Sequence, residues 1–149
     1  MTFAADTNIY VYLHDDGEPE KQAVARDLVK AMSTANAAVA LQVVGEVQNV
    51  LRRRLKMPAH LASQEARNVY VSLSSFAYDA ACVERALAQS AAGRLGYWDA
   101  LLLAACDRAG ISVLFSEDMQ DGFKMGGVEV VNPFGSPGLS ARACERLES

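Results

Sequence analysis

The chain has 149 residues, a formal net charge of −4 at pH 7 and 51% apolar residues. This length is typical of one compact domain, and no apolar run approaches the ~18 residues needed to cross a membrane. Since the start has no basic region before an apolar stretch, we expect no signal peptide and a cytoplasmic protein. The acidic balance excludes a broad basic nucleic-acid surface, so any nucleic acid would be held by local basic groups or by metal ions.

Cysteine and histidine are too few and too scattered for several common kinds of site. The three cysteines, Cys82, Cys106 and Cys144, are odd in number and far apart. This pattern argues against a disulfide framework and a CxxC zinc ribbon, and it suits a reducing compartment. With only His14 and His60, a zinc site or a catalytic triad that needs histidine has little to draw on.

The first part of the chain predicts two short strands and two helices. Phe3 to Ala5 is an apolar run that ends in Asp-Thr-Asn, which suits a buried strand leaving into a turn. Ile9 to Leu13 predicts the start of a short helix. Gly17 to Glu20 predicts the start of a longer one, with proline and acidic residues in its first turn. A second strand is expected from Ala37 to Leu41.

The rest of the chain predicts helices separated by clear breaks and ends in two further strands. Pro58, Gly93 and Gly110 mark helix ends. Helices are expected over residues 42–56, 59–73, 79–92 and 98–109, and strands over 111–115 and 128–131. Short apolar strands that alternate with helices predict an α/β fold with a parallel sheet covered on both faces. Residues 1–135 form the expected domain, and 136–149 form a C-terminal tail that is loosely held or ordered by a partner.

Acidic residues stand where such a fold places its chemistry, beyond the carboxyl ends of the strands. Asp6 follows the first strand, and Glu117, Asp118 and Asp121 follow the strand that ends at Phe115. Asp99 lies in the first turn of its helix, where the helix dipole favours a carboxylate. A further acid, Glu46, lies inside a helix on the side of Val43, Val50 and Arg53, so it needs a partner at the edge of the core.

Carboxylates that converge on one cleft repel each other, by roughly 3 kcal/mol for two charges ~5 Å apart at an effective dielectric of about 20. A divalent cation relieves this repulsion, and oxygen ligands without nearby histidine or cysteine favour Mg²⁺ or Mn²⁺. Such ions activate water in phosphodiester hydrolysis. Taken singly, each acid has a simpler explanation: Asp6 and Asp99 as helix-start residues, Glu46 as an ion-pair partner of an arginine, and the 117–121 acids as a solvated turn.

Four segments together resemble the PIN-domain ribonucleases, in particular VapC-type toxins of bacterial toxin–antitoxin pairs. These segments are ADTNIYVYLHDD, LQVVGEVQNVL, GYWDALLLAAC and VLFSEDMQDG, within roughly residues 2–134. The resemblance implies a three-layer α/β/α fold, a divalent metal, hydrolysis of RNA, frequent homodimers and a cognate antitoxin.

The same resemblance assigns site residues by position. Asp6, Asp99 and Asp118 match metal-binding acids, and Glu46 matches the acid of the middle helix. Asn8 and Ser116 match supporting positions. Glu117 and Asp121 compete with Asp118 for the fourth acidic position. In this hypothesis Glu46 positions or deprotonates the attacking water.

The basic and aromatic residues near these acids suggest how RNA is guided. Arg53 lies two turns beyond Glu46 on one helical face, and Arg94 precedes the Gly96–Asp99 segment. Either arginine is alternatively solvated surface, and Arg53 alternatively binds the antitoxin. Tyr97 and Trp98 could stack on bases, but Trp98 beside an apolar helix is expected in the core or in a dimer contact.

Two rival functions remain open from the sequence. A phosphatase of the haloacid-dehalogenase type also places an acid after its first strand, but Asn8 occupies the position of its second acid. A PIN-like module that has lost catalysis and only binds RNA or protein would usually lack one of the acids, and here all are present. Metal-dependent cleavage of RNA separates these functions.

Overall fold

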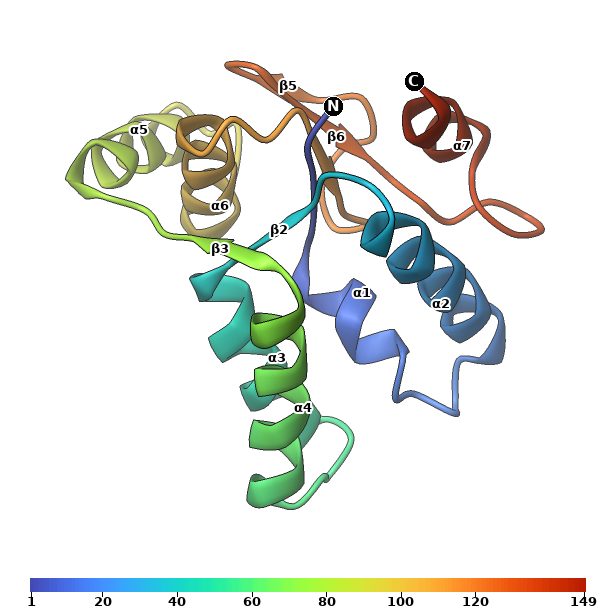
Figure 1. Cartoon of the computed structure of the whole chain (residues 1–149). Coiled ribbons are helices and arrows are strands. Elements are labelled where there is room, and N and C mark those ends of the chain that lie inside the picture. Colours follow the sequence, from blue (N-terminus) through green and yellow to red (C-terminus); the bar gives the residue numbers. More distant parts are fainter.

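The computed structural model describes residues 1–149 and is organised around a four-stranded sheet (Figure 1). Its strand order is β1 (Phe3–Ala5), β4 (Val113–Phe115), β6 (Val128–Val131) and β5 (Lys124–Met125). The first three strands are parallel, and β5 is an antiparallel edge strand. The register pairs Ala5 with Phe115, so β1 and β4 end side by side at one edge of the sheet.

A second, two-stranded parallel sheet joins β2 (Ala38–Ala40) to β3 (Ser74–Phe76). A single bridge between Phe3 and Ala37 connects it to β1. The predicted strand near residues 37–41 is therefore present. Neither β3 nor β5 was predicted, because β3 begins with two exposed serines and β5 is only two residues long.

Helices lie on both sides of the main sheet, as an α/β/α layering requires. In Figure 1, α5 (Ala80–Ala91) and α6 (Tyr97–Arg108) lie on one side, and α1 (Thr7–Tyr12), α2 (Pro19–Ser33) and α7 (Ala141–Glu148) lie on the other. The paired helices α3 (Leu41–Arg53) and α4 (Ala59–Ser72) project away from the sheet. No helix is long and apolar enough to cross a membrane.

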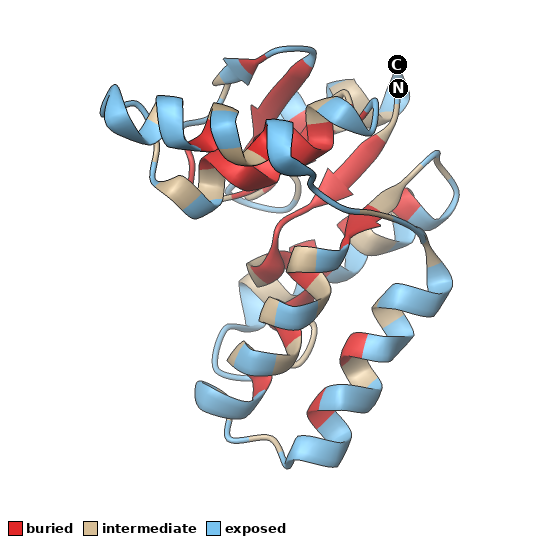
Figure 2. Ribbon diagram, turned by 90° about the vertical axis from the view of Figure 1, so that its left-hand side faces the viewer, coloured by how far each residue is buried: buried red, intermediate tan, exposed pale blue.

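Helix α6 is the most deeply buried helix of the fold. Every residue from Ala100 to Cys106 is buried, and Figure 2 shows buried residues gathered on this helix and on the strands. Small alanines and leucines fill the space between α5 and the sheet without a polar face. Because residues 100–106 are buried, they fix the position of the first turn, which carries Asp99.

The predicted helices are present, and their ends lie at most three residues from the expected ones. The expected strand over 111–115 is shorter and begins at Val113. The largest difference lies in residues 136–149, where α7 forms after Ser140, whose Oγ accepts a hydrogen bond from the Ala143 N–H at 3.2 Å. Buried Ala143 packs into the core cluster, and Arg146 donates two hydrogen bonds to Glu129 of β6, at 2.9 and 3.2 Å.

The Arg146–Glu129 pair should contribute measurably to stability. Glu129 is buried on β6, and the adjacent guanidinium lowers its pKa. Arg146→Met should lower the free energy of unfolding at pH 7 by about 1–3 kcal/mol, because it leaves a desolvated carboxylate without a partner. Since the pKa is lowered in the folded state, this contribution is present above the unfolded value near 4.5 and is lost as pH falls through the folded value.

Urea unfolding at pH 7 measures this loss, and Arg142→Met is the matched control. Arg142 also lies on α7, but its ion pair with Asp121 is exposed and spans 3.8 Å, so its loss should cost less than about 0.5 kcal/mol. Equal losses in the two variants would contradict the assignment.

Candidate active site

Asp6 stands at the end of β1, where three elements meet. Its N–H donates to the Phe115 carbonyl of β4 at 2.9 Å. Its Oδ1 accepts a hydrogen bond from the Thr7 N–H at 2.7 Å and thereby caps α1. Its Oδ2 accepts a hydrogen bond from the Ser116 hydroxyl at 3.0 Å. The carboxylate is buried, with 7% of the residue exposed, and all these partners hold it in one orientation.

Ser116 connects Asp6 to the next acid along the sheet edge. Besides donating to Asp6, its Oγ accepts a hydrogen bond from the Asp118 N–H at 3.3 Å. The Asp118 carboxylate accepts a hydrogen bond at Oδ2 from the Asn8 amide, at 3.1 Å. Asn8 and Ser116, both predicted as supporting residues, therefore hold the segments after β1 and β4 together.

Glu46 reaches the same site from α3. Its Oε2 accepts a hydrogen bond from the Thr7 hydroxyl at 2.7 Å, and its Oε1 accepts one from the Gln42 amide at 3.1 Å. Gln42 also lies 3.4 Å from the Trp98 carbonyl at the start of α6. The partner that Glu46 needed is thus Thr7, next to Asp6, and not an arginine. Sequence reasoning missed Thr7 and Gln42, for which the polar character of the first helical turns was the only signal.

Asp99 completes the set from the first turn of α6. It is half-buried, and its side chain makes no hydrogen bond. Burial raises its pKa most, and the charges of Asp118 and Glu46 raise it further. A carboxylate held near two others without a donor of its own is suited to bind a cation.

The pKa shifts show that these acids lie within electrostatic range of one another. Burial raises the pKa of Asp6 to about 6, with smaller contributions from Asp118 and Asp99 in the same direction, although bonds from Thr7 and Ser116 oppose the rise. Burial also raises the pKa of Asp118, whereas the charges of Arg54 and Lys21 lower it. Ionising Asp6, Asp99 and Asp118 together is therefore costly until positive charge is added.

The donor set fits a hard divalent cation. It consists of carboxylate oxygens with hydroxyl and amide neighbours, the ligands that Mg²⁺ and Mn²⁺ prefer. As the side chains stand, no group of three or more acidic, histidine or cysteine residues is close enough to hold a metal ion. The site therefore brings the acids within electrostatic range of one another without closing them into a ligand cage.

The three acids after β4 point to different places. Glu117 accepts hydrogen bonds from Tyr12 and, at 2.8 Å, from Lys21. Asp121 Oδ1 accepts a hydrogen bond from the Asn132 N–H at 2.9 Å, away from the site. Only Asp118 is linked to Asp6, through Ser116, so it is the structure's candidate for the fourth acid.

The predicted basic residues, Arg53 and Arg94, lie on the surface. Arg53, Arg54 and Lys56 line an open hollow with Val50 at the end of α3. Arg53 and Arg94 are exposed and form no ion pair. Arg54, which was not predicted, is the arginine whose charge acts on Asp118. Trp98 does not lie in the core, because 63% of the residue is exposed. The expected alternative of a dimer contact stays a prediction.

Comparison with known proteins identifies the family. A family model described as the PIN domain matches residues 4–124, and the chain therefore belongs to the PIN domain family. This confirms the resemblance drawn from the four sequence segments. A comparison with curated proteins finds no match.

Three solved structures share the fold. The VapC20 toxin of Mycobacterium tuberculosis, described as cleaving the sarcin–ricin loop, has a TM-score of 0.64 and 19% identity over 78% of this chain and 89% of that chain. VapBC2 of Rickettsia felis, bound to a promoter DNA fragment, has a TM-score of 0.63 and 16% identity over 89% and 98%. A toxin–antitoxin complex from Klebsiella pneumoniae has a TM-score of 0.62 and 21% identity over 87% and 96%.

The buried charge of Asp6 should make the metal-free protein less stable as pH rises. With a folded pKa of about 6 against an ordinary pKa of 3.8 for aspartate, the folded state binds the proton more tightly, so stability falls between these two pH values and stays low above them. Asp6→Asn removes this cost. Its free energy of unfolding at pH 7.5 should exceed that of the unmodified chain by about 1–3 kcal/mol, and the gain should shrink to less than half at pH 4.5.

Urea unfolding in EDTA at the two pH values measures this gain. Asp121→Asn is the control, since asparagine can still accept the bond from Asn132 and the group is exposed. A gain that is the same at both pH values, or a loss of stability in Asp6→Asn, would contradict the electrostatic account.

Proposed function

We propose that the protein is an endoribonuclease dependent on Mg²⁺ or Mn²⁺, and the toxin of a toxin–antitoxin pair. One observation carries this proposal: Asp6, Glu46, Asp99 and Asp118 converge from four segments on one sheet edge. Buried Asp6 is held there by Ser116 and Thr7 even though ionising it is costly. A fold maintains such an arrangement at a cost to its own stability, which is typical of a working site.

Each residue has a role in this proposal that follows from its contacts. Asp6, Asp99 and Asp118 would hold the cation. When bound, the cation supplies a Lewis acid that acidifies water and stabilises charge on the scissile phosphate. Glu46, fixed by Thr7 and Gln42, orients the attacking water and accepts its proton.

The partners and substrate are proposed from the family and the shared fold. Two of the similar structures are toxin–antitoxin complexes, which supports an antitoxin as the protein's partner in the cytoplasm. The Mycobacterium tuberculosis toxin is described as cleaving the sarcin–ricin loop, so ribosomal RNA is a substrate to test first. A homodimer is also proposed, as the family resemblance implies.

Replacing a site acid should abolish cleavage of RNA. Purified protein is incubated with total RNA in Mg²⁺, Mn²⁺ or EDTA. We expect cleavage with either metal and none with EDTA. Asp6→Asn and Asp99→Asn should each lower the rate at least about 100-fold, because they remove a ligand charge. Asp121→Asn, the control among the competing acids, should keep most of the activity.

Two outcomes would contradict this proposal. Full activity of Asp6→Asn or Asp99→Asn would refute the assignment of the site. No cleavage with any metal, together with Mn²⁺ binding too weak to detect, would favour the alternative of a catalytically silent module that binds RNA or protein.

Ser116 should matter for metal affinity through the orientation of Asp6 and Asp118. Ser116→Ala removes both hydrogen bonds and should weaken Mn²⁺ binding about 10- to 100-fold, measured by electron paramagnetic resonance. Ser112→Ala is a matched control, since Ser112 flanks β4 at its other end and also makes two hydrogen bonds, both to Thr2. Equal effects of the two substitutions would contradict the orienting role of Ser116.

A further inference from the structure

Residues 116–122 form the loop that carries Asp118 between β4 and β5. The backbone of this loop is tied to the neighbouring strand β6 near both ends, because the Ser116 and Gly122 N–H groups donate to β6 carbonyls at 3.1 and 2.8 Å. These bonds fix where the loop leaves and rejoins the sheet. The side chains of Glu117 and Asp118, by contrast, are held from helices α1 and α2.

One face of α1 holds these two consecutive acids. The Asn8 amide donates to Asp118 at 3.1 Å, and the Tyr12 hydroxyl donates to Glu117. Positions 8 and 12 are four residues apart and therefore lie on the same side of a helix. The first turn of the same helix is capped by Asp6. A short, rigid helix thus connects Asp6 and Asp118, two of the acids on which the proposed metal site depends.

Lys21 of α2 completes the hold on Glu117. Its ammonium donates to Glu117 Oε2 at 2.8 Å and to the Tyr12 hydroxyl at 3.2 Å. The same ammonium lies 5.1 Å from the centre of the Tyr12 ring and 5.4 Å from that of Phe134. The two rings pack edge to face, with centroids 5.4 Å apart. These four residues, Tyr12, Lys21, Glu117 and Phe134, are called the Glu117 cluster below.

Fold stability alone does not account for the Glu117 cluster. Only 15% of the Glu117 side chain is exposed, and an ion pair partly withdrawn from water contributes little net stability, because the lost hydration offsets the attraction. The loop does not need the cluster to join the sheet, since its backbone is already bonded to β6. The cluster acts on the residue that directly precedes Asp118.

We propose that Tyr12, Lys21 and Glu117 are positioning residues that hold the Asp118 carboxylate toward Asp6 for metal binding. Glu117 is not itself a metal ligand, since Tyr12 occupies its Oε1 and Lys21 its Oε2. The inference rests on the proposed function and adds three residues that act through Asp118.

Tyr12→Phe tests this inference, because it removes one hydroxyl and leaves the charge and the aromatic ring in place. Binding of Mn²⁺ is measured by electron paramagnetic resonance. We expect the variant to bind Mn²⁺ about 10-fold more weakly, as is typical when a partner of a metal ligand is lost. Equal affinities of the variant and the unmodified chain would overturn the inference.

Tyr10→Phe is the matched control for this substitution. Tyr10 also lies on α1 and is buried, but its hydroxyl has no hydrogen-bond partner. Removing that hydroxyl should leave Mn²⁺ binding unchanged. The same loss in Tyr10→Phe and Tyr12→Phe would show a general effect of altering α1 and would overturn the inference.

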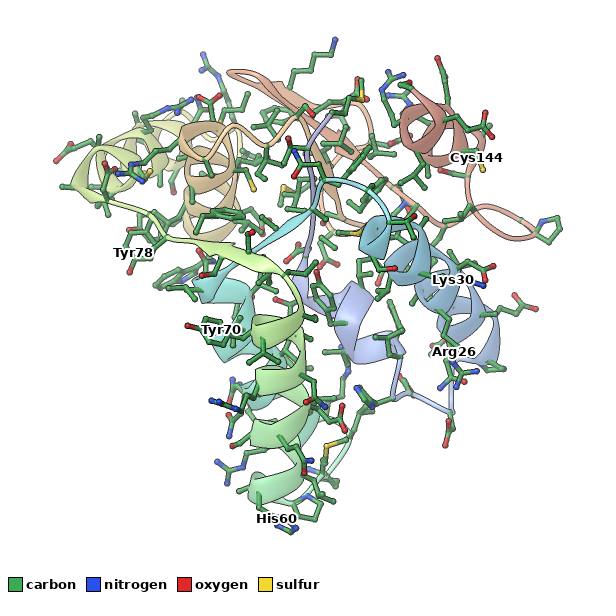
Figure 3. All side chains as sticks on the ribbon, viewed as in Figure 1. Arg26, Lys30, His60, Tyr70, Tyr78 and Cys144 are labelled. Carbon is green, nitrogen blue, oxygen red and sulfur yellow. The ribbon has the colours of Figure 1, made fainter.

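Lys21→Met separates positioning from charge. Loss of a nearby positive charge would by itself strengthen the binding of a cation, whereas loss of positioning weakens it. We expect Mn²⁺ binding at least about 3-fold weaker. Lys30→Met is the control, because Lys30 is an exposed lysine of the same helix without an ion pair (Figure 3). Tighter binding in Lys21→Met would overturn the positioning role of Lys21.

Hydrogen exchange of the metal-free protein gives a readout that does not depend on metal. In Tyr12→Phe, amides of residues 116–122 should exchange about 2- to 10-fold faster, the effect expected from losing one hydrogen bond. Amides of α5, which does not contact the Glu117 cluster, should keep their rates. Equal acceleration in both segments would indicate a general loss of stability and would overturn the inference.

The neighbouring acids distinguish failure of this inference from failure of the proposed function. Asp118→Asn should weaken Mn²⁺ binding more than Glu117→Gln does, since only the first removes a ligand. If Glu117→Gln has the larger effect and Tyr12→Phe has none, Glu117 is the ligand, which overturns the inference but not the proposed function. If the unmodified chain neither binds Mn²⁺ nor cleaves RNA, both are refuted. Weaker Mn²⁺ binding in Tyr12→Phe, without cleavage by the unmodified chain, would support the inference and refute only the nuclease activity.

Discussion

Burial of the Asp6 carboxylate is the constraint around which the sheet edge is built. A buried charge needs donors, and here they come from two directions: the Thr7 N–H at the start of α1 and the Ser116 hydroxyl after β4. The second donor depends on the register that pairs Ala5 with Phe115, because a shift of one residue would move Ser116 away. The same register brings Asp118 into the field of Asp6. The geometry of the site is thus fixed by the pairing of two short strands.

The distribution of positive charge decides which acids can serve a metal. Glu117 and Asp121 are close to Asp118 in sequence, yet Lys21 and Tyr12 engage the first, and Asn132 and Arg142 engage the second. Their charges are satisfied within the fold. No ion pair involves the other four acids, Asp6, Glu46, Asp99 and Asp118. Three of them accept hydrogen bonds and Asp99 accepts none, so their negative charge remains available.

Sequence patterns predicted the elements and the acids that depend on local rules. Asp6 and Asp99 stand out at a strand end and a helix start, and helical spacing predicted that Glu46 faces inward. The choice among Glu117, Asp118 and Asp121 could not be made from sequence, because residues 11 to 110 positions away determine it. Strand β3 was missed because its pairing with β2, not its own composition, makes it a strand. Of the two expectations for Trp98, burial in the core was wrong, because residue type predicts burial only where another element covers the helix, and a dimer contact stays a prediction.

A net charge of −4 has a consequence for how such a protein would approach RNA. With no broad basic surface, long-range attraction is weak, and the uncompensated acids repel phosphates at the site itself. Arg54 and its neighbours in the hollow are too few to reverse this repulsion, and Lys21 is neutralised. A divalent cation at the four carboxylates would reduce the local negative charge as well as supply the chemistry. In the proposed function, binding of RNA and binding of metal would therefore be coupled, because a bound cation reduces the repulsion between the site acids and a phosphate.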